Sequence, residues 1–153
     1  MYFIVSTQLS YKGIAMDLNQ HRYEELLKYW QIFSAAMSKV SNPKYFEIKR
    51  ESDFDFEFEL FGFTFTSVFS HNFITADFII YMTTNISNKS HWDKNTFQPI
   101  ELAEFKIHLG GDIETNIKRF KHINIHQIES SPSEFNSVVL RTLIDRALEQ
   151  PVA

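Results

Sequence analysis

The chain has 153 residues and a mass of 18.1 kDa, which is the size of a single domain. Its 44% hydrophobic and 22% charged residues are typical of a globular protein, and no apolar run has the length of a transmembrane helix. The net charge of −4 disfavours a nucleic-acid-binding protein, and the absence of cysteine excludes disulfides and thiolate metal ligands. The N-terminus lacks the pattern of a secretion signal, so we expect a cytoplasmic protein that does not enter membranes.

The N-terminal part of the chain is expected to form a short strand and then a long helix. Residues 2–5 are apolar, as in a short buried strand. Asp17 and Gln20 have the spacing of a capping box, and apolar residues recur at helical spacing from Tyr23 to Val40. The pair Asn42-Pro43 is a stop signal, so the pattern predicts an amphipathic helix that begins at Asp17 and ends before it.

From residue 45 onward the period of the apolar residues changes to two. Apolar side chains, most of them Phe, occupy most even positions between Phe46 and Leu60, and charged residues occupy the odd positions. This alternation predicts half-buried antiparallel strands. The parity changes at Phe61-Gly62, which predicts a hairpin turn although Phe is unusual there. The hairpin would join three apolar pairs on one face: Leu60 with Phe63, Phe58 with Phe65, and Phe54 with Phe69.

The rest of the chain is predicted from shorter patterns. Three further segments are expected to be strands: residues 73–84, 104–109 and 122–128. Residues 85–99 are polar and aperiodic and predict a long loop, and Gly110-Gly111-Asp112 predicts a turn. Residues 113–120 fit either a strand or a helical turn. Ser131 and Glu134, with Pro132 between them, predict the start of a C-terminal helix.

Together these elements predict an α+β fold in one domain that spans residues 1–153. A single, mainly antiparallel sheet of five or six strands would carry two long amphipathic helices on its Phe-lined face, one near the N-terminus and one at the C-terminus. The opposite face of the sheet would be open to solvent.

Signatures of common enzymes and metal sites are missing from the sequence. No nucleophile elbow, phosphate-binding loop, dinucleotide-binding glycine motif or H-E-x-x-H motif is present. His122 and His126 would be about 13 Å apart on a strand, which is too far to share a metal ion. Glu57 and Asp77 would flank Thr66, but on an open face where nothing raises the pKa of a carboxyl group. We therefore expect no catalytic residues, no metal and no cofactor, and an enzyme is the least favoured class.

The strongest candidate for a binding surface is an acidic row on the outer face of the predicted sheet. Like charges along one strand repel one another, which costs stability. Val68, Ile79 and Tyr81 are expected on the same face, and apolar residues with a charged rim are typical of protein interfaces. The predicted partner-binding residues are Asp53, Asp55, Glu57, Glu59 and Asp77, with Tyr81 and Trp92 as apolar anchors.

We therefore interpret the chain as a non-enzymatic intracellular binding protein whose partner is a basic protein. A bacterial immunity or inhibitor protein would have these features. Two alternatives stay open. The basic residues between Lys118 and His122 could contact the acidic row of a second copy and form a homodimer. A small-molecule or lipid-like ligand could instead occupy a Phe-lined cavity between the sheet and the C-terminal helix.

Overall fold

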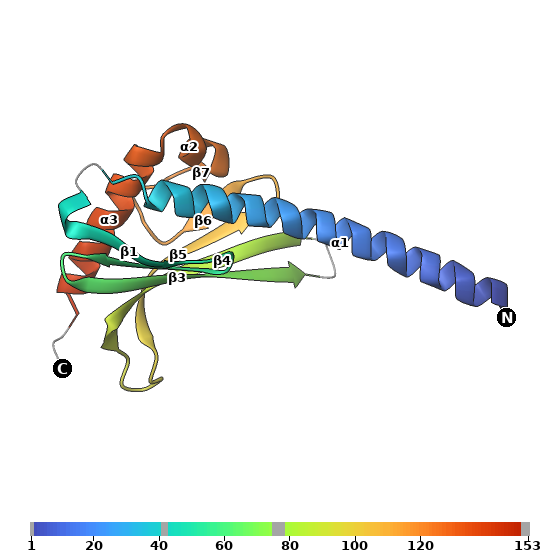
Figure 1. The fold of residues 1–153 in the computed structure, drawn as a ribbon, viewed down its shortest axis with the longest axis horizontal. Coiled ribbons are helices and arrows are strands. Elements are labelled where there is room, and N and C mark those ends of the chain that lie inside the picture. The colour runs from blue at the N-terminus through green and yellow to red at the C-terminus, as the bar shows by residue number, and fades with distance from the viewer. Residues whose placement is uncertain (1, 41–42, 75–78, 151–153) are drawn as a thin grey trace.

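The computed structural model describes residues 2–40, 43–74 and 79–150, and it shows one antiparallel sheet with helices on one face (Figure 1). The predicted α+β fold is confirmed, but its element count was too low: the described chain has seven strands and three α-helices. The strands follow one another across the sheet in chain order. The elements are α1 (Tyr2–Met37), a 3-10 turn η1 (Pro43–Tyr45), β1 (Phe46–Glu51), β2 (Asp55–Leu60), β3 (Phe63–Ile74), β4 (Ile79–Trp92), β5 (Pro99–His108), β6 (Asp112–Thr115), β7 (Ile123–Asn124), α2 (Ile125–Ser130) and α3 (Pro132–Leu148).

Helix α1 runs without interruption from Tyr2 to Met37, so the strand expected at residues 2–5 is wrong. Asp17 lies inside the helix rather than at its start. The segment before Asp17 contains no proline, and its one glycine, Gly13, costs about 1 kcal/mol in a helix interior, which a long helix tolerates. The N-terminal part of α1 extends past the sheet, whereas its C-terminal part crosses it (Figure 1).

The hairpin between β2 and β3 has the predicted register. Two of the expected pairs form within the ladder: Leu60 with Phe63, and Phe58 with Phe65. The third pair is joined just beyond it, where the N–H of Phe69 donates a 2.7 Å hydrogen bond to the carbonyl of Phe54. At the turn, Phe61 and Gly62 both have positive φ, 50° and 82°, as a two-residue type I′ turn requires.

The strand predicted over residues 73–84 is wrong at both ends: residues 73 and 74 belong to β3, and β4 continues past Thr84 to Trp92. The continuation was missed because polar residues occupy positions that face the core. Thr84 and Asn88 are both fully buried. The hydroxyl of Thr84 hydrogen-bonds to that of Ser67, and the Nδ2 of Asn88 lies 2.7 Å from the Nδ1 of His91. Because these hydrogen bonds satisfy the buried polar groups, polar side chains can lie on the core side of a strand. The polar composition of the segment alone does not predict such a strand. The long loop predicted at residues 85–99 is therefore wrong, and the loop between β4 and β5 spans only residues 93–98.

The strand predicted over residues 122–128 is also wrong, because most of this segment is helical. Only β7 is extended, and α2 follows it directly. The side chain of Asn124 accepts a hydrogen bond from the N–H of His126, and the side chain of Gln127 accepts one from the N–H of Asn124. This reciprocal capping box starts the helix where the Ile content alone indicates a strand.

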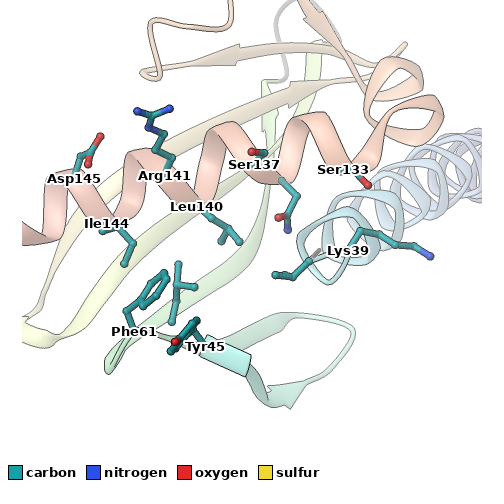
Figure 2. A pocket seen from close by; sticks show the side chains of 12 residues that line it. Lys39, Tyr45, Phe61, Ser133, Ser137, Leu140, Arg141, Ile144 and Asp145 are labelled. Atoms are coloured by element: carbon teal, nitrogen blue, oxygen red, sulfur yellow. The ribbon is translucent and has the colours of Figure 1, made fainter. Parts of the chain in front are cut away.

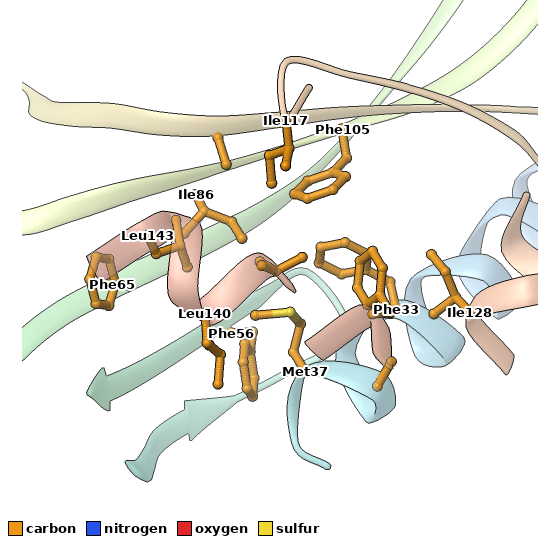
Figure 3. Close-up of a cluster of buried hydrophobic side chains, with 14 of the residues drawn as sticks. Phe33, Met37, Phe56, Phe65, Ile86, Phe105, Ile117, Ile128, Leu140 and Leu143 are labelled. Carbon is orange, nitrogen blue, oxygen red and sulfur yellow. The ribbon is translucent and has the colours of Figure 1, made fainter. Parts of the chain in front are cut away.

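Helices α1 and α3 pack on the same face of the sheet, as predicted, and share one core with β5. The rings of Phe33 of α1 and Phe105 of β5 have centroids 5.1 Å apart (Figure 3). The ring of Phe135 of α3 contacts both, with centroids 5.6 Å from Phe33 and 5.9 Å from Phe105. Helix α3 begins at Pro132 as expected, although Ser131 makes no side-chain capping hydrogen bond. The core therefore occupies one face of the sheet, and any exposed site lies on the other face or at its margins.

Candidate functional site

The predicted acidic row lies on the outer face of the sheet, as expected from its register. Asp55, Glu57 and Glu59 alternate along β2 with buried neighbours, whereas Asp53 is exposed in the turn between β1 and β2. Val68 stands opposite Asp55 and is 49% exposed. The expected juxtaposition of carboxylates with an exposed apolar side chain is therefore present in this part of the sheet.

Cations from both sides neutralise much of this acidic row. The Nη2 of Arg50 lies 2.7 Å from the Oδ2 of Asp55 and 3.7 Å from the Oε2 of Glu57. The Nζ of Lys89 lies 3.0 Å from the same oxygen of Glu57. A separate ion pair joins Lys49 of β1 to Glu59, with the Nζ of Lys49 3.7 Å from the Oε2 of Glu59. Because these pairs join β1, β2 and β4, the outer face presents an interlaced set of charges rather than an open negative patch.

The register separates the predicted carboxylate pair. Thr66 stands between Glu57 of β2 and Ser87 of β4, so the arrangement of Glu57 and Asp77 on either side of Thr66 is wrong. Asp77 itself lies outside the described residues. The prediction failed because β4 pairs with β3 through later residues: Thr84 lies opposite Phe69, and Ile79 lies opposite Ile74.

The two predicted apolar anchors lie on β4. The backbone of Tyr81 pairs with Asn72 on one side and with His108 on the other. Trp92 is at the end of β4, beside the turn to β5, and is 57% exposed. The structure therefore does not gather Trp92 with the acidic row into a single apolar centre, and partner binding by these residues stays a prediction.

His108 makes a local ion pair on the outer surface. The Nε2 of His108 lies 2.9 Å from the Oε2 of Glu114, and this hydrogen bond and charge lower the pKa of Glu114. His126 belongs to the first turn of α2, and His122 precedes β7. Within residues 2–40, 43–74 and 79–150, no three His, Asp or Glu side chains are placed to hold a metal ion.

A groove of about 450 Å³ lies between α3, the end of α1 and the hairpin turn of β2 and β3 (Figure 2). We call it the α3 groove. Its floor is formed by buried Leu60, Leu140 and Asn136, and its walls by half-buried Val40 and Ile144. The volume, and the apolar floor and walls below a polar rim, are compatible with a small-molecule site.

Two aromatic side chains stand at the mouth of the α3 groove. The rings of Tyr45 and Phe61 are stacked with centroids 4.9 Å apart, and the residues are 47% and 58% exposed. The N–H of Phe61 donates a 3.0 Å hydrogen bond to the carbonyl of Tyr45, which fixes the two backbones together. Leu140 and Ile144 point from α3 toward these rings (Figure 2). An apolar molecule could therefore lie between aromatic and aliphatic surfaces.

The floor of the groove carries one buried amide. Asn136 is 3% exposed, and its Nδ2 donates hydrogen bonds of 3.2 and 2.8 Å to the carbonyls of Ala36 and Met37 at the end of α1. These carbonyls belong to the last turn of α1, where the carbonyl of Ala36 also accepts a 3.1 Å hydrogen bond from the N–H of Lys39. Asn136 thus has a structural role in ending α1 and lines the groove as well.

Charged and hydroxyl groups surround the opening. Lys39, Arg141 and Asp145 are exposed around it, together with Ser133 and Ser137. Arg141 and Asp145 point away from the two aromatic rings (Figure 2). Asp145 is the one carboxylate among these described lining residues.

The α3 groove was missed at the level of sequence because its lining comes from four separate segments. The one local signal is Phe61, an aromatic residue in a turn that favours Asn or Gly. Asn136 gives a weaker signal, as a polar residue at a core position of an amphipathic helix.

Comparison with known proteins gives no relative. No family model matches the chain, and neither a curated protein nor a solved structure is significantly similar to it. Among the described helices, none combines the length and the hydropathy that crossing a membrane requires. Function has to be inferred from the site itself.

Proposed function

We propose that the protein is a non-enzymatic binding protein that holds a small, largely apolar ligand in the α3 groove. The observation that carries this proposal is the position of the exposed Tyr45–Phe61 stack at the mouth of the α3 groove. A bulky side chain at positive φ costs roughly 1 kcal/mol or more, and here the ring of Phe61 is also left 58% exposed. Such a cost is commonly found where a residue serves binding, and Phe61 stands at the mouth of an apolar groove.

The ligand would lie between the Tyr45–Phe61 stack and the aliphatic side chains of α3. Burying about half of one Phe side chain against a ligand is worth about 1 kcal/mol, or roughly a fivefold change in the dissociation constant. The groove is open rather than enclosed, so moderate affinity and rapid exchange are expected.

The test is a titration with 1-octanol, followed by NMR on the methyl groups of Leu140 and Ile144. Phe61→Asn keeps the type I′ turn and removes the ring, so we expect it to weaken 1-octanol binding about fivefold. Phe97→Asn is the matched control, because Phe97 also has positive φ, 55°, and is 78% exposed, but does not line the groove. The proposal is wrong if 1-octanol leaves these methyl signals unchanged, or if both variants weaken binding equally.

We keep the docking of a basic protein on the acidic outer face as a second candidate function. It is favoured by the exposed Val68 beside Asp55, because an apolar side chain among carboxylates is typical of an interface. Charges there would mainly speed the association and make it sensitive to salt. The ion pairs with Arg50 and Lys89 weigh against it, since a partner would have to displace them.

A further inference from the structure

We propose that the α3 groove selects ligands whose polar end donates a hydrogen bond, and that the Oδ1 of Asn136 is the acceptor. This inference rests on the proposed function, because it names the class of ligand for the same groove. The ligand would be a neutral alcohol, phenol or amide with an apolar body. The argument depends on how the side-chain amide of Asn136 is oriented.

The orientation of the Asn136 amide follows from its partners. Two main-chain carbonyls, those of Ala36 and Met37, lie within hydrogen-bond distance of one terminal atom of the side chain. Carbonyls are acceptors only, so this atom has to be the amide nitrogen, which carries two N–H donors. The opposite assignment would place an oxygen against two oxygens. The Oδ1 of Asn136 is therefore the atom that remains for other partners.

No hydrogen bond within the described part of the chain uses this Oδ1 atom. Asn136 as a residue is 97% buried, but its Oδ1 is not among the fully buried atoms without a partner, so this acceptor is open to a molecule in the groove. Because Asn136 lines the floor of the groove, an O–H or N–H group of a ligand can supply the missing donor. An ether or a carboxylate cannot, since each would bring an acceptor against an acceptor.

The apolar part of the ligand then has a defined place. With its donor at Asn136, the molecule would extend along α3 past Leu140 and Ile144 toward Phe61 at the mouth of the groove (Figure 2). The cations Lys39 and Arg141 stand at the exposed rim rather than at the floor. A charged head group would therefore bind at a different place from a neutral donor.

The experiment compares three ligands of similar shape on the unmodified protein: 4-butylphenol, 4-butylanisole and 4-butylbenzoate. The phenol can donate a hydrogen bond, the anisole can only accept one, and the benzoate is ionised at neutral pH. We expect the phenol to bind roughly five- to tenfold more tightly than the anisole, as one neutral hydrogen bond allows. Binding is followed by NMR, and the phenol should also shift the side-chain amide signals of Asn136.

Each outcome has a separate meaning. Equal binding of phenol and anisole would overturn the role of Asn136 while leaving the groove as a ligand site. Tightest binding of the benzoate, lost in Arg141→Gln, would also overturn it and place the polar end at the rim. Failure of all three ligands to bind would contradict the proposed function itself. In the expected case, Arg141→Gln leaves the ratio of phenol to anisole affinities unchanged.

Discussion

Tyr29 shows how a single buried polar side chain ties α1 to the sheet. Its hydroxyl donates a 2.6 Å hydrogen bond to the Oε1 of Glu25 and accepts one of 3.2 Å from the N–H of Gly110, in the turn between β5 and β6. The residue is 5% exposed, and burial, followed by the bond to Glu25, raises the pKa of Tyr29 to about 12.

This pKa predicts a loss of stability at high pH. An unfolded tyrosine releases its proton near pH 10, whereas the folded protein retains it to about pH 12, so stability falls as the pH rises between these values. The contribution lost is about 2–3 kcal/mol. We expect Tyr29→Phe to lower the free energy of unfolding by about 1–2 kcal/mol at neutral pH and to show a flatter profile from pH 10 to 12. Urea unfolding at several pH values measures both effects, and parallel profiles would contradict the assignment.

At the scale of elements, the turn between β5 and β6 packs against the start of α2, where the N–H of Ile125 donates a 2.8 Å hydrogen bond to the carbonyl of Gly111. Gly110 and Gly111 have φ of 98° and 101°, which disfavours any residue with a side chain. A Cβ on Gly111 would lie 2.7 Å from the Cγ2 of Ile125 and 3.1 Å from the Oδ1 of Asn124, the capping residue of α2. A Cβ on Gly110 would meet no atom within 4 Å.

The two glycines therefore form a matched pair for substitution. Gly110→Ala should cost about 1–2 kcal/mol from backbone strain alone. Gly111→Ala should cost about 2–4 kcal/mol, because displacement of Ile125 and Asn124 is added to the same strain. Urea unfolding with amide exchange in α2 would check this: equal costs, or α2 amides equally protected in both variants, would show that the contact with α2 is unimportant.

Elements were predictable from sequence where the pattern of burial was simple. The alternation of Phe with charged residues along β2 specified the register of the hairpin to the residue, because a slip by one position would expose all the Phe side chains. The pattern failed in β4, where buried Thr84 hydrogen-bonds to Ser67 and buried Asn88 hydrogen-bonds to His91, because the apolar pattern does not identify these partners. It failed again at α2, where the cap at Asn124 prevails over the strand propensity of the Ile residues.

At the scale of the whole molecule, the candidate site was less predictable than the fold. The acidic row was placed on the correct face, but the cations that pair with it come from β1 and from β4, whose register was not predicted. The α3 groove depends on Tyr45, Phe61, Leu140 and Asn136, which are close together only after α3 has packed beside the hairpin. Sites of this kind follow from tertiary packing and leave only weak local signals in the chain.

The charge of the outer face provides a test that separates a structural role from a docking role. A triple variant, Asp55→Asn with Glu57→Gln and Glu59→Gln, removes the row and leaves Lys49, Arg50 and Lys89 without these partners. If the ion pairs are structural, stability should fall by about 1–2 kcal/mol, and the loss should shrink in high salt.

A docking surface would behave in the opposite way, because repulsion within an unpaired acidic row lowers stability until a partner binds. Neutralising the row would then raise stability, slow association with a decalysine peptide and reduce its salt dependence. The distances of 2.7 and 3.0 Å from Arg50 to Asp55 and from Lys89 to Glu57 lead us to expect the structural result. Urea unfolding at two salt concentrations and stopped-flow binding of decalysine distinguish the two roles. A triple variant that is more stable than the unmodified protein would restore the outer face as the main binding surface.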